Sequence, residues 1–110
     1  MSARRIILVL GVLACATPGL RAGAYEETVR PVLEHRCIAC HGETVTNAGV
    51  RLDNLPVNFL EDRRATETWH DVLNALNRGE MPPKAAPQLT ADERTAVVDW
   101  LTLNFAELEY

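Results

Sequence analysis

A short stretch of the sequence, RCIACHG at positions 36–42, holds two cysteines and a histidine at a spacing that could do chemistry. Cys37 and Cys40 are three positions apart, and His41 follows the second cysteine directly. Two cysteines at this spacing could form a redox-active dithiol or supply half of a zinc site. Together with the histidine, they could also attach a haem covalently. The rest of the sequence distinguishes these three interpretations.

The haem interpretation uses all three residues. A redox dithiol usually lies next to a strand–helix–strand pattern, and no strand pattern precedes Cys37. A structural zinc ion requires four ligands, but His35, His70 and the carboxylates lie at unsuitable spacing. In haem attachment, two thiols add to two vinyl groups, and the adjacent histidine becomes an axial ligand of the iron. The sequence therefore predicts one covalent haem c on Cys37 and Cys40, with His41 as an axial ligand. A disulfide between the two cysteines, without haem, is a weaker alternative.

A candidate for the second axial ligand lies in the segment RGEMPPK at positions 78–84. Met81 is the only methionine apart from the initiating one, and two prolines follow it. Methionine is most often core filler, but filler does not need a rigid setting, and Pro82 biases Met81 toward an extended backbone. A thioether ligand also raises the reduction potential of a haem. We therefore expect Met81 to bind the iron, with His70 or an open position as the alternatives.

The other histidines and the possible partners of the haem propionates are expected to have structural roles. His35 falls on the helix of the tether and cannot reach the opposite face of the haem, and His70 is expected on the solvent side of its helix. Trp69 is expected in the core, although its indole N–H is a lesser candidate for a propionate. The arginines expected at the surface are Arg51, Arg63 and Arg64.

The first 24 residues have the order of a secretory signal peptide. Two arginines form a positive start, an apolar run follows, and AGA at positions 22–24 offers small residues for cleavage. The run is shorter than the roughly 20 apolar residues that span a bilayer. A lipoprotein is the alternative, because the segment VLAC that ends at Cys15 resembles a lipobox. We therefore expect a signal peptide at 1–24 and one domain at 25–110.

Size and charge narrow the class of this domain. Removing 24 of the 110 residues leaves 86, close to the size at which a core alone gives marginal stability and a bound cofactor adds to it. The signal contributes three basic residues and no acidic ones, so a net charge of −4 for the whole chain becomes −7 for the domain. This acidic balance argues against nucleic acid or an anionic membrane as a partner.

Three segments have apolar residues at helical spacing, and none alternates long enough to predict a sheet. The first covers about Thr28 to Ala39, and the second begins near Thr66 or Thr68 and ends at Gly79. The third opens at Thr90, which has capping-box spacing to Glu93. We therefore expect an all-α fold of about three helices.

The segment between the first two helices, Gly42 to Ala65, is rich in apolar residues but has no sustained period. An unstructured loop of this length normally counts against an assignment of elements. It becomes reasonable if the loop packs its apolar side chains on something other than protein. We therefore expect these side chains to contact a large cofactor.

Together these residues resemble the class I c-type cytochromes, and more narrowly the planctomycete-type cytochrome c domain. The resemblance covers about Val29 to Phe105 and rests on VRPVLEHRCIACHG, AGVRLDNL, the second helix, GEMPP and VVDWL. It implies a small cytochrome c-like fold of helices wrapped around one covalently bound haem. It also implies that Cys37 and Cys40 are the thioether sites, that His41 is the proximal ligand and that Met81 is the distal ligand.

The expected function is that of a periplasmic or otherwise extracytoplasmic carrier of single electrons. With both axial positions filled, only electrons react at the metal, so we do not expect an enzyme. The expected partners are redox proteins, donor and acceptor, whose docking patch is basic because this surface is acidic. Membrane association is expected only if Cys15 is lipidated. The alternative is a haem-based sensor, or a cytochrome subunit of a larger oxidoreductase, in which a small ligand displaces Met81.

Overall fold

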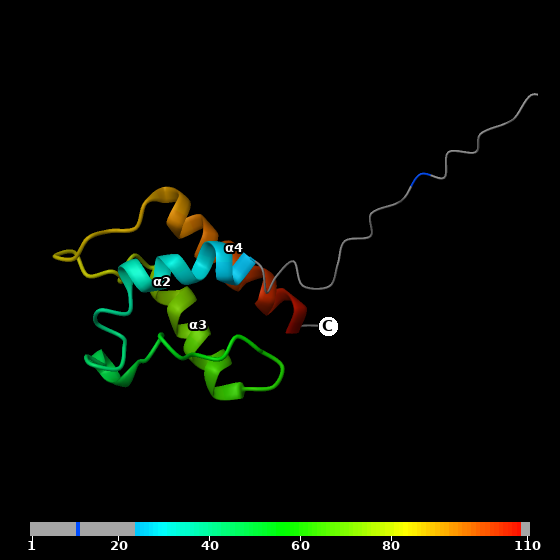
Figure 1. The fold of residues 1–110 in the computed structure, drawn as a ribbon, viewed down its shortest axis with the longest axis horizontal. Coiled ribbons are helices and arrows are strands. Elements are labelled where there is room, and N and C mark those ends of the chain that lie inside the picture. The colour runs from blue at the N-terminus through cyan, green and yellow to red at the C-terminus, as the bar shows by residue number, and fades with distance from the viewer. Residues whose placement is uncertain (1–10, 12–23, 109–110) are drawn as a thin grey trace, which may run out of the picture.

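The computed structural model describes residue 11 and residues 24–108, so the predicted signal peptide lies almost entirely outside the described part. The helical segments are the π-helical turn η1 (Tyr25–Val29), α2 (Arg30–Arg36), the 3₁₀ turn η2 (Asn47–Gly49), α3 (Arg63–Asn77) and α4 (Ala91–Leu108) (Figure 1). No strand occurs among the described residues, where an isolated antiparallel bridge joins His41 to Thr46. The all-α expectation is therefore confirmed. Within the described ranges, no helix is both long and apolar enough to cross a membrane.

The first helical region begins and ends about three residues earlier than the sequence predicts. η1 starts at Tyr25, and α2 ends at Arg36, before the first cysteine of the motif. Cys37 leaves the helical region of the backbone with a φ of −123°. The amides of Cys40 and His41 then both donate to the carbonyl of Cys37, at 3.2 and 3.0 Å. The motif is therefore a tight turn folded after the helix, and not the last turn of the helix itself.

α3 begins before the threonines at 66 and 68 because an aspartate caps it. The side-chain Oδ1 of Asp62 accepts a hydrogen bond from the amide of Ala65 at 2.9 Å, so the first turn begins at Arg63. The end of the helix agrees with the prediction. Gly79 has a φ of +69°, the left-handed conformation that glycine adopts without a steric cost.

The capping box predicted for the third helix is present at the start of α4. The amide of Glu93 donates to Oγ1 of Thr90 at 3.1 Å, and the amide of Thr90 donates to Oε1 of Glu93 at 2.9 Å. The guanidinium of Arg94 donates to the carbonyl of Leu76 at 2.6 Å. A cation at this position is favoured by the dipole of α3, and the bond joins the end of α3 to the start of α4.

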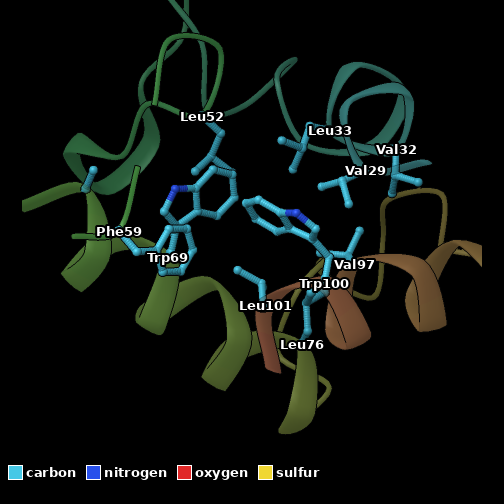
Figure 2. Close-up of a cluster of buried hydrophobic side chains, with 11 residues drawn as sticks. Val29, Val32, Leu33, Leu52, Phe59, Trp69, Leu76, Val97, Trp100 and Leu101 are labelled. Atoms are coloured by element: carbon cyan, nitrogen blue, oxygen red, sulfur yellow. The ribbon is translucent and has the colours of Figure 1, made fainter. Parts of the chain in front are cut away.

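An aromatic cluster forms the centre of the core (Figure 2). Trp69 of α3 and Trp100 of α4 are buried, and their ring centroids lie 5.2 Å apart in an edge-to-face arrangement. Tyr25 and Phe59 extend the cluster, with ring centroids 5.1 and 5.5 Å from that of Trp100. η1 and α3 therefore both pack against α4. The other buried hydrophobic residues are aliphatic: Val29, Val32, Leu33, Leu52, Ala65, Leu76, Val97 and Leu101.

The expectation that the long loop before α3 packs on something other than protein is wrong for Phe59, which packs on protein. Phe59 is 8% exposed, and its ring stacks on that of Trp69 with centroids 6.2 Å apart. The indole N–H of Trp69 donates to the carbonyl of Pro56 at 2.8 Å. The indole N–H of Trp69, a lesser candidate to bond a haem propionate, is therefore already engaged within the protein. Val50 and Leu52, by contrast, line a cavity that is described below.

A partly buried ion pair joins the end of α2 to the start of α4. Nε and Nη2 of Arg36 donate to the carboxylate of Glu93 at 3.1–3.3 Å, and the two side chains are 26% and 21% exposed. The bonds from Arg36, followed by the amide of Thr90, lower the pKa of Glu93 to about 2. Because Arg36 precedes Cys37 directly, the pair fixes the start of the cysteine turn onto α4.

We predict that Phe59→Ala lowers the free energy of unfolding by about 3–5 kcal/mol, because it removes a buried aromatic ring and leaves a cavity. Leu60 is the matched control, since it is the next residue in the chain and is 83% exposed. Leu60→Ala is expected to change the free energy of unfolding by less than about 0.5 kcal/mol. Urea unfolding followed by circular dichroism measures both values. Equal effects of the two substitutions would contradict the packing of Phe59.

We predict that Glu93 stabilises the fold fully above about pH 4.5 and that this contribution is lost as the pH falls toward about 2. The pKa of Glu93 drops from its ordinary value of 4.5 to about 2 on folding, so in this window the unfolded chain binds the proton more readily than the folded one. The difference in unfolding free energy between the native chain and Glu93→Gln should therefore be largest at neutral pH and should shrink between pH 4.5 and 2. Urea unfolding at several pH values measures it.

The matched control for this experiment is Glu67→Gln, which breaks the exposed ion pair between Arg63 and Glu67. Exposed pairs contribute little to stability, so this substitution is expected to give almost no difference at any pH. A difference as large as that of Glu93→Gln would show that burial of the Arg36–Glu93 pair is not the cause.

Candidate functional site

A cavity of about 270 Å³ lies beside the aromatic core, between α2, α3 and two loop segments. Its walls are mainly aliphatic and include Val32, Leu33, Val50, Leu52, Val72 and Leu76. Cys37, Cys40, His41 and Met81 line the same cavity. The structure therefore brings together all four residues that the sequence singled out, although Met81 follows the cysteine motif by forty positions.

A second cavity, of about 280 Å³, lies at the far end of α4 and lacks groups suited to this chemistry. It is lined by residues 57–60 and by Asn104, Glu107 and Leu108. No cysteine, histidine or methionine is among the described residues that line it. The candidate site is therefore the first cavity.

Hydrogen bonds to the backbone of the following loop orient His41. Nδ1 of its ring lies 3.3 Å from the carbonyl oxygen of Val50. A carbonyl oxygen only accepts hydrogen bonds, so a bond here needs the tautomer with the proton on Nδ1, and that tautomer leaves the lone pair of Nε2 for a metal. The amide of Leu52 donates to the carbonyl of His41 at 2.8 Å, which fixes the backbone as well. This arrangement is the one that a histidine ligand requires.

Gly42 lets the chain after His41 fold tightly against the cysteine turn. A Cβ atom at this position would lie 2.5 Å from the carbonyl oxygen of Ile38 and 3.1 Å from its Cγ2. The first contact is with backbone, which cannot move aside as a flexible side chain could. A residue without a side chain is therefore required directly after the candidate ligand.

The thiol of Cys37 does not have the lowered pKa of a redox dithiol. Both are free thiols, with Cys37 half-buried and Cys40 exposed. Burial, with a smaller contribution from the carboxylate of Glu93, raises the pKa of Cys37 to about 11. A reactive dithiol needs a lowered thiol pKa. Within the described residues, no three His, Cys, Asp or Glu side chains gather so that they could hold a metal ion.

Met81 lies on the loop between α3 and α4, where its side chain lines the cavity and is 40% exposed. Sequence reasoning attributed the order of this loop to the prolines and missed Gln88. The side-chain Nε2 of Gln88 donates to the carbonyls of Pro82, Pro83 and Ala86 at 3.3, 2.9 and 3.0 Å. A lone glutamine in a loop gives no signal in a sequence, since its partners are backbone atoms.

The other residues that the sequence considered lie away from the cavity, as expected. His35 and His70 are exposed, and His70 contacts the ring of Phe105 with centroids 5.5 Å apart. Neither histidine lines the cavity. The arginines make surface contacts: Arg51 pairs with Asp53, and Arg63 pairs with Glu67.

The residues of the cavity fit a covalently attached haem by their chemistry. Two free thiols stand at the spacing of the attachment motif, an imidazole presents Nε2, and a thioether lies on a separate segment. These donors line a cavity whose other walls are mainly aliphatic. Such walls suit a large apolar ring. Soft sulfur and imidazole are ligands that haem iron accepts.

Comparison with known proteins agrees with this chemistry. Residues 26–101 match the family described as cytochrome C oxidase, cbb3-type, subunit III, and the match includes both the cysteine motif and Met81. No curated protein and no solved structure matches the chain. The resemblance to class I c-type cytochromes is thus confirmed, while the narrower planctomycete-type resemblance stays a prediction. The all-helical fold and the family match together establish that this chain belongs to the cbb3-type subunit III family of class I c-type cytochrome domains.

Proposed function

We propose that this chain is an exported mono-haem c-type cytochrome, which carries single electrons between redox proteins. The observation that carries the proposal is the gathering of Cys37, Cys40, His41 and Met81 around one cavity in a chain of this family. A haem bound there supplies one-electron chemistry, because its iron alternates between the ferric and ferrous states.

Each of the four residues has one role. Cys37 and Cys40 tether the haem through thioether bonds, and His41 offers Nε2 as the proximal ligand. Met81 offers its sulfur from the loop between α3 and α4 as the distal ligand. The aliphatic walls limit the access of water, and a less polar surrounding tunes the reduction potential.

The ligand set also accounts for why we propose a carrier and not an enzyme. A thioether stabilises ferrous iron and so raises the reduction potential. With His41 and Met81 both bound, no coordination position is left for a substrate. The chain then contributes binding, orientation and exclusion of water, and only electrons cross its surface.

The proposed partners rest on the charge of the domain, and the proposed location rests on the sequence of the first 24 residues. A domain charge of −7 after removal of the signal favours redox partners with a basic docking patch. We place the protein in the periplasm, or otherwise outside the cytoplasm. This placement is supported by the signal-peptide order of residues 1–24, with a positive start, an apolar run and small residues at 22–24.

A cytochrome subunit of a larger oxidoreductase, or a haem sensor, is the second candidate. It is favoured by the 40% exposure of Met81, which lets a small ligand compete for the distal side. The family description, which names an oxidase subunit, favours the subunit. The spectroscopic experiment below separates a sensor from a carrier.

We predict that the secreted protein has the mass of residues 25–110 plus one haem, and that the haem resists extraction with acidified acetone. Intact-mass measurement tests cleavage after Ala24 and covalent attachment together. Cys37→Ala combined with Cys40→Ala is expected to abolish the attachment, whereas Cys15→Ala keeps it. A chain that begins at Cys15 with a diacylglycerol-sized increment would establish a lipoprotein, and a haem that is extracted cleanly, or none, would overturn the tether.

We predict that Met81→Ala removes the near-infrared charge-transfer band of a thioether bound to ferric haem. The reduction potential should fall, because sulfur stabilises ferrous iron more than the water that replaces it. Carbon monoxide should then bind the ferrous form. His70→Ala is the control, since His70 does not line the cavity, and it should leave the spectrum unchanged. The reverse pattern would identify a bis-histidine cytochrome. Rapid binding of carbon monoxide to the native protein would favour the sensor.

A further inference from the structure

The loop that carries Met81 is fixed at both ends, but its middle contains no helix or strand. At its start, the amide of Glu80 donates to the carbonyl of Ala75 at 3.0 Å, which closes the end of α3. At its end, the capping box of α4 fixes the chain. Between these points Pro82 and Pro83 lack an N–H group, so the backbone next to Met81 has few donors of its own.

A single side chain donates to the carbonyl groups of this segment. Nε2 of Gln88 lies 3.3, 2.9 and 3.0 Å from the carbonyl oxygens of Pro82, Pro83 and Ala86, so its two protons are shared among three acceptors. Three carbonyl oxygens around one atom require that atom to be the amide nitrogen, because an oxygen there would have no proton to offer. The amide of Ala86 also donates to the carbonyl of Pro83 at 2.9 Å, so that the side chain and a turn hold the same backbone.

All three residues whose carbonyls Gln88 binds line the cavity, whereas Gln88 itself does not and is exposed. We propose that Gln88 is a positioning residue for Met81: its amide holds the backbone that follows Met81 against the cavity and so keeps the sulfur at the iron. This inference rests on the proposed function, in which Met81 is the distal ligand.

The hydrogen bonds of Gln88 should determine how often Met81 detaches and opens the distal side of the cavity. Met81 is 40% exposed, so little else in the described part of the chain covers its side chain. The net contribution of a hydrogen bond to stability is modest. Loss of the Gln88 contacts is therefore expected to raise the fraction of molecules with Met81 detached by about tenfold, and not to unfold the domain. Gln88 would thereby favour electron carriage over the binding of small ligands.

The experiment uses the full-length haem-loaded protein and two variants of Gln88. Gln88→Glu keeps the shape of the side chain but replaces the donor by oxygens that face three carbonyls. Gln88→Leu removes the donor without adding charge. If Gln88→Glu does not fold, the test is made with Gln88→Leu alone. Both are expected to weaken the near-infrared thioether band and to increase the rate of carbon monoxide binding to the ferrous form by about tenfold, in line with the open fraction.

The matched control is Asn104→Asp. Nδ2 of Asn104 also donates to a backbone carbonyl, that of Trp100 at 2.8 Å, but it lies on α4 and lines the second cavity. This variant loses the same kind of hydrogen bond and is expected to keep the native band and the native rate.

Three outcomes would overturn the inference. In the first, both Gln88 variants keep the native band and rate. In the second, Asn104→Asp changes both as strongly, so that the effect is general destabilisation. In the third, the native protein lacks the thioether band, and the assignment of Met81 as distal ligand fails together with the role of Gln88. Only the third outcome contradicts the proposed ligand set. A failure of the Gln88 inference can therefore be distinguished from a failure of the proposed function.

Discussion

The packing of Trp69 against Trp100 is the contact on which the rest of the structure depends. These two rings join α3 to α4, and Tyr25 and Phe59 attach η1 and the long loop to them. Aromatic side chains bury the largest area per residue. A domain of this size has few residues to bury, so a core centred on rings leaves aliphatic side chains available to line a cavity beside it.

α3 shows how closely the core and the cavity share the chain. Trp69 belongs to the aromatic cluster, Val72 and Ala75 line the cavity, and Leu76 belongs to both the core and the cavity wall. Neighbouring faces of one helix therefore serve stability and the candidate site. A shift of α3 that repacks the tryptophans also moves the wall of the cavity, so the geometry of the site is tied to the packing of the core.

The sequence predicted the features that depend on near neighbours. The capping box of Thr90 and Glu93 and the end of α3 at Gly79 follow from spacing within short segments, and local patterns of the same kind singled out the four candidate site residues. The ion pair of Arg36 with Glu93 joins residues 57 positions apart, and Gln88 binds backbone oxygens, so neither leaves a local pattern. The long loop was predicted only in part, because periodicity cannot tell an apolar residue that packs on protein from one that faces a cavity.

The carboxylate of Glu93 belongs to two structures at once, since it accepts from the amide of Thr90 and from the guanidinium of Arg36. Thr90 ends the loop that carries Met81, and Arg36 begins the turn that carries the cysteines. The first turn of α4 therefore cannot fray without loosening the chain on both sides of the cavity. One acidic side chain thus joins the two candidate ligand segments, although they are far apart in sequence.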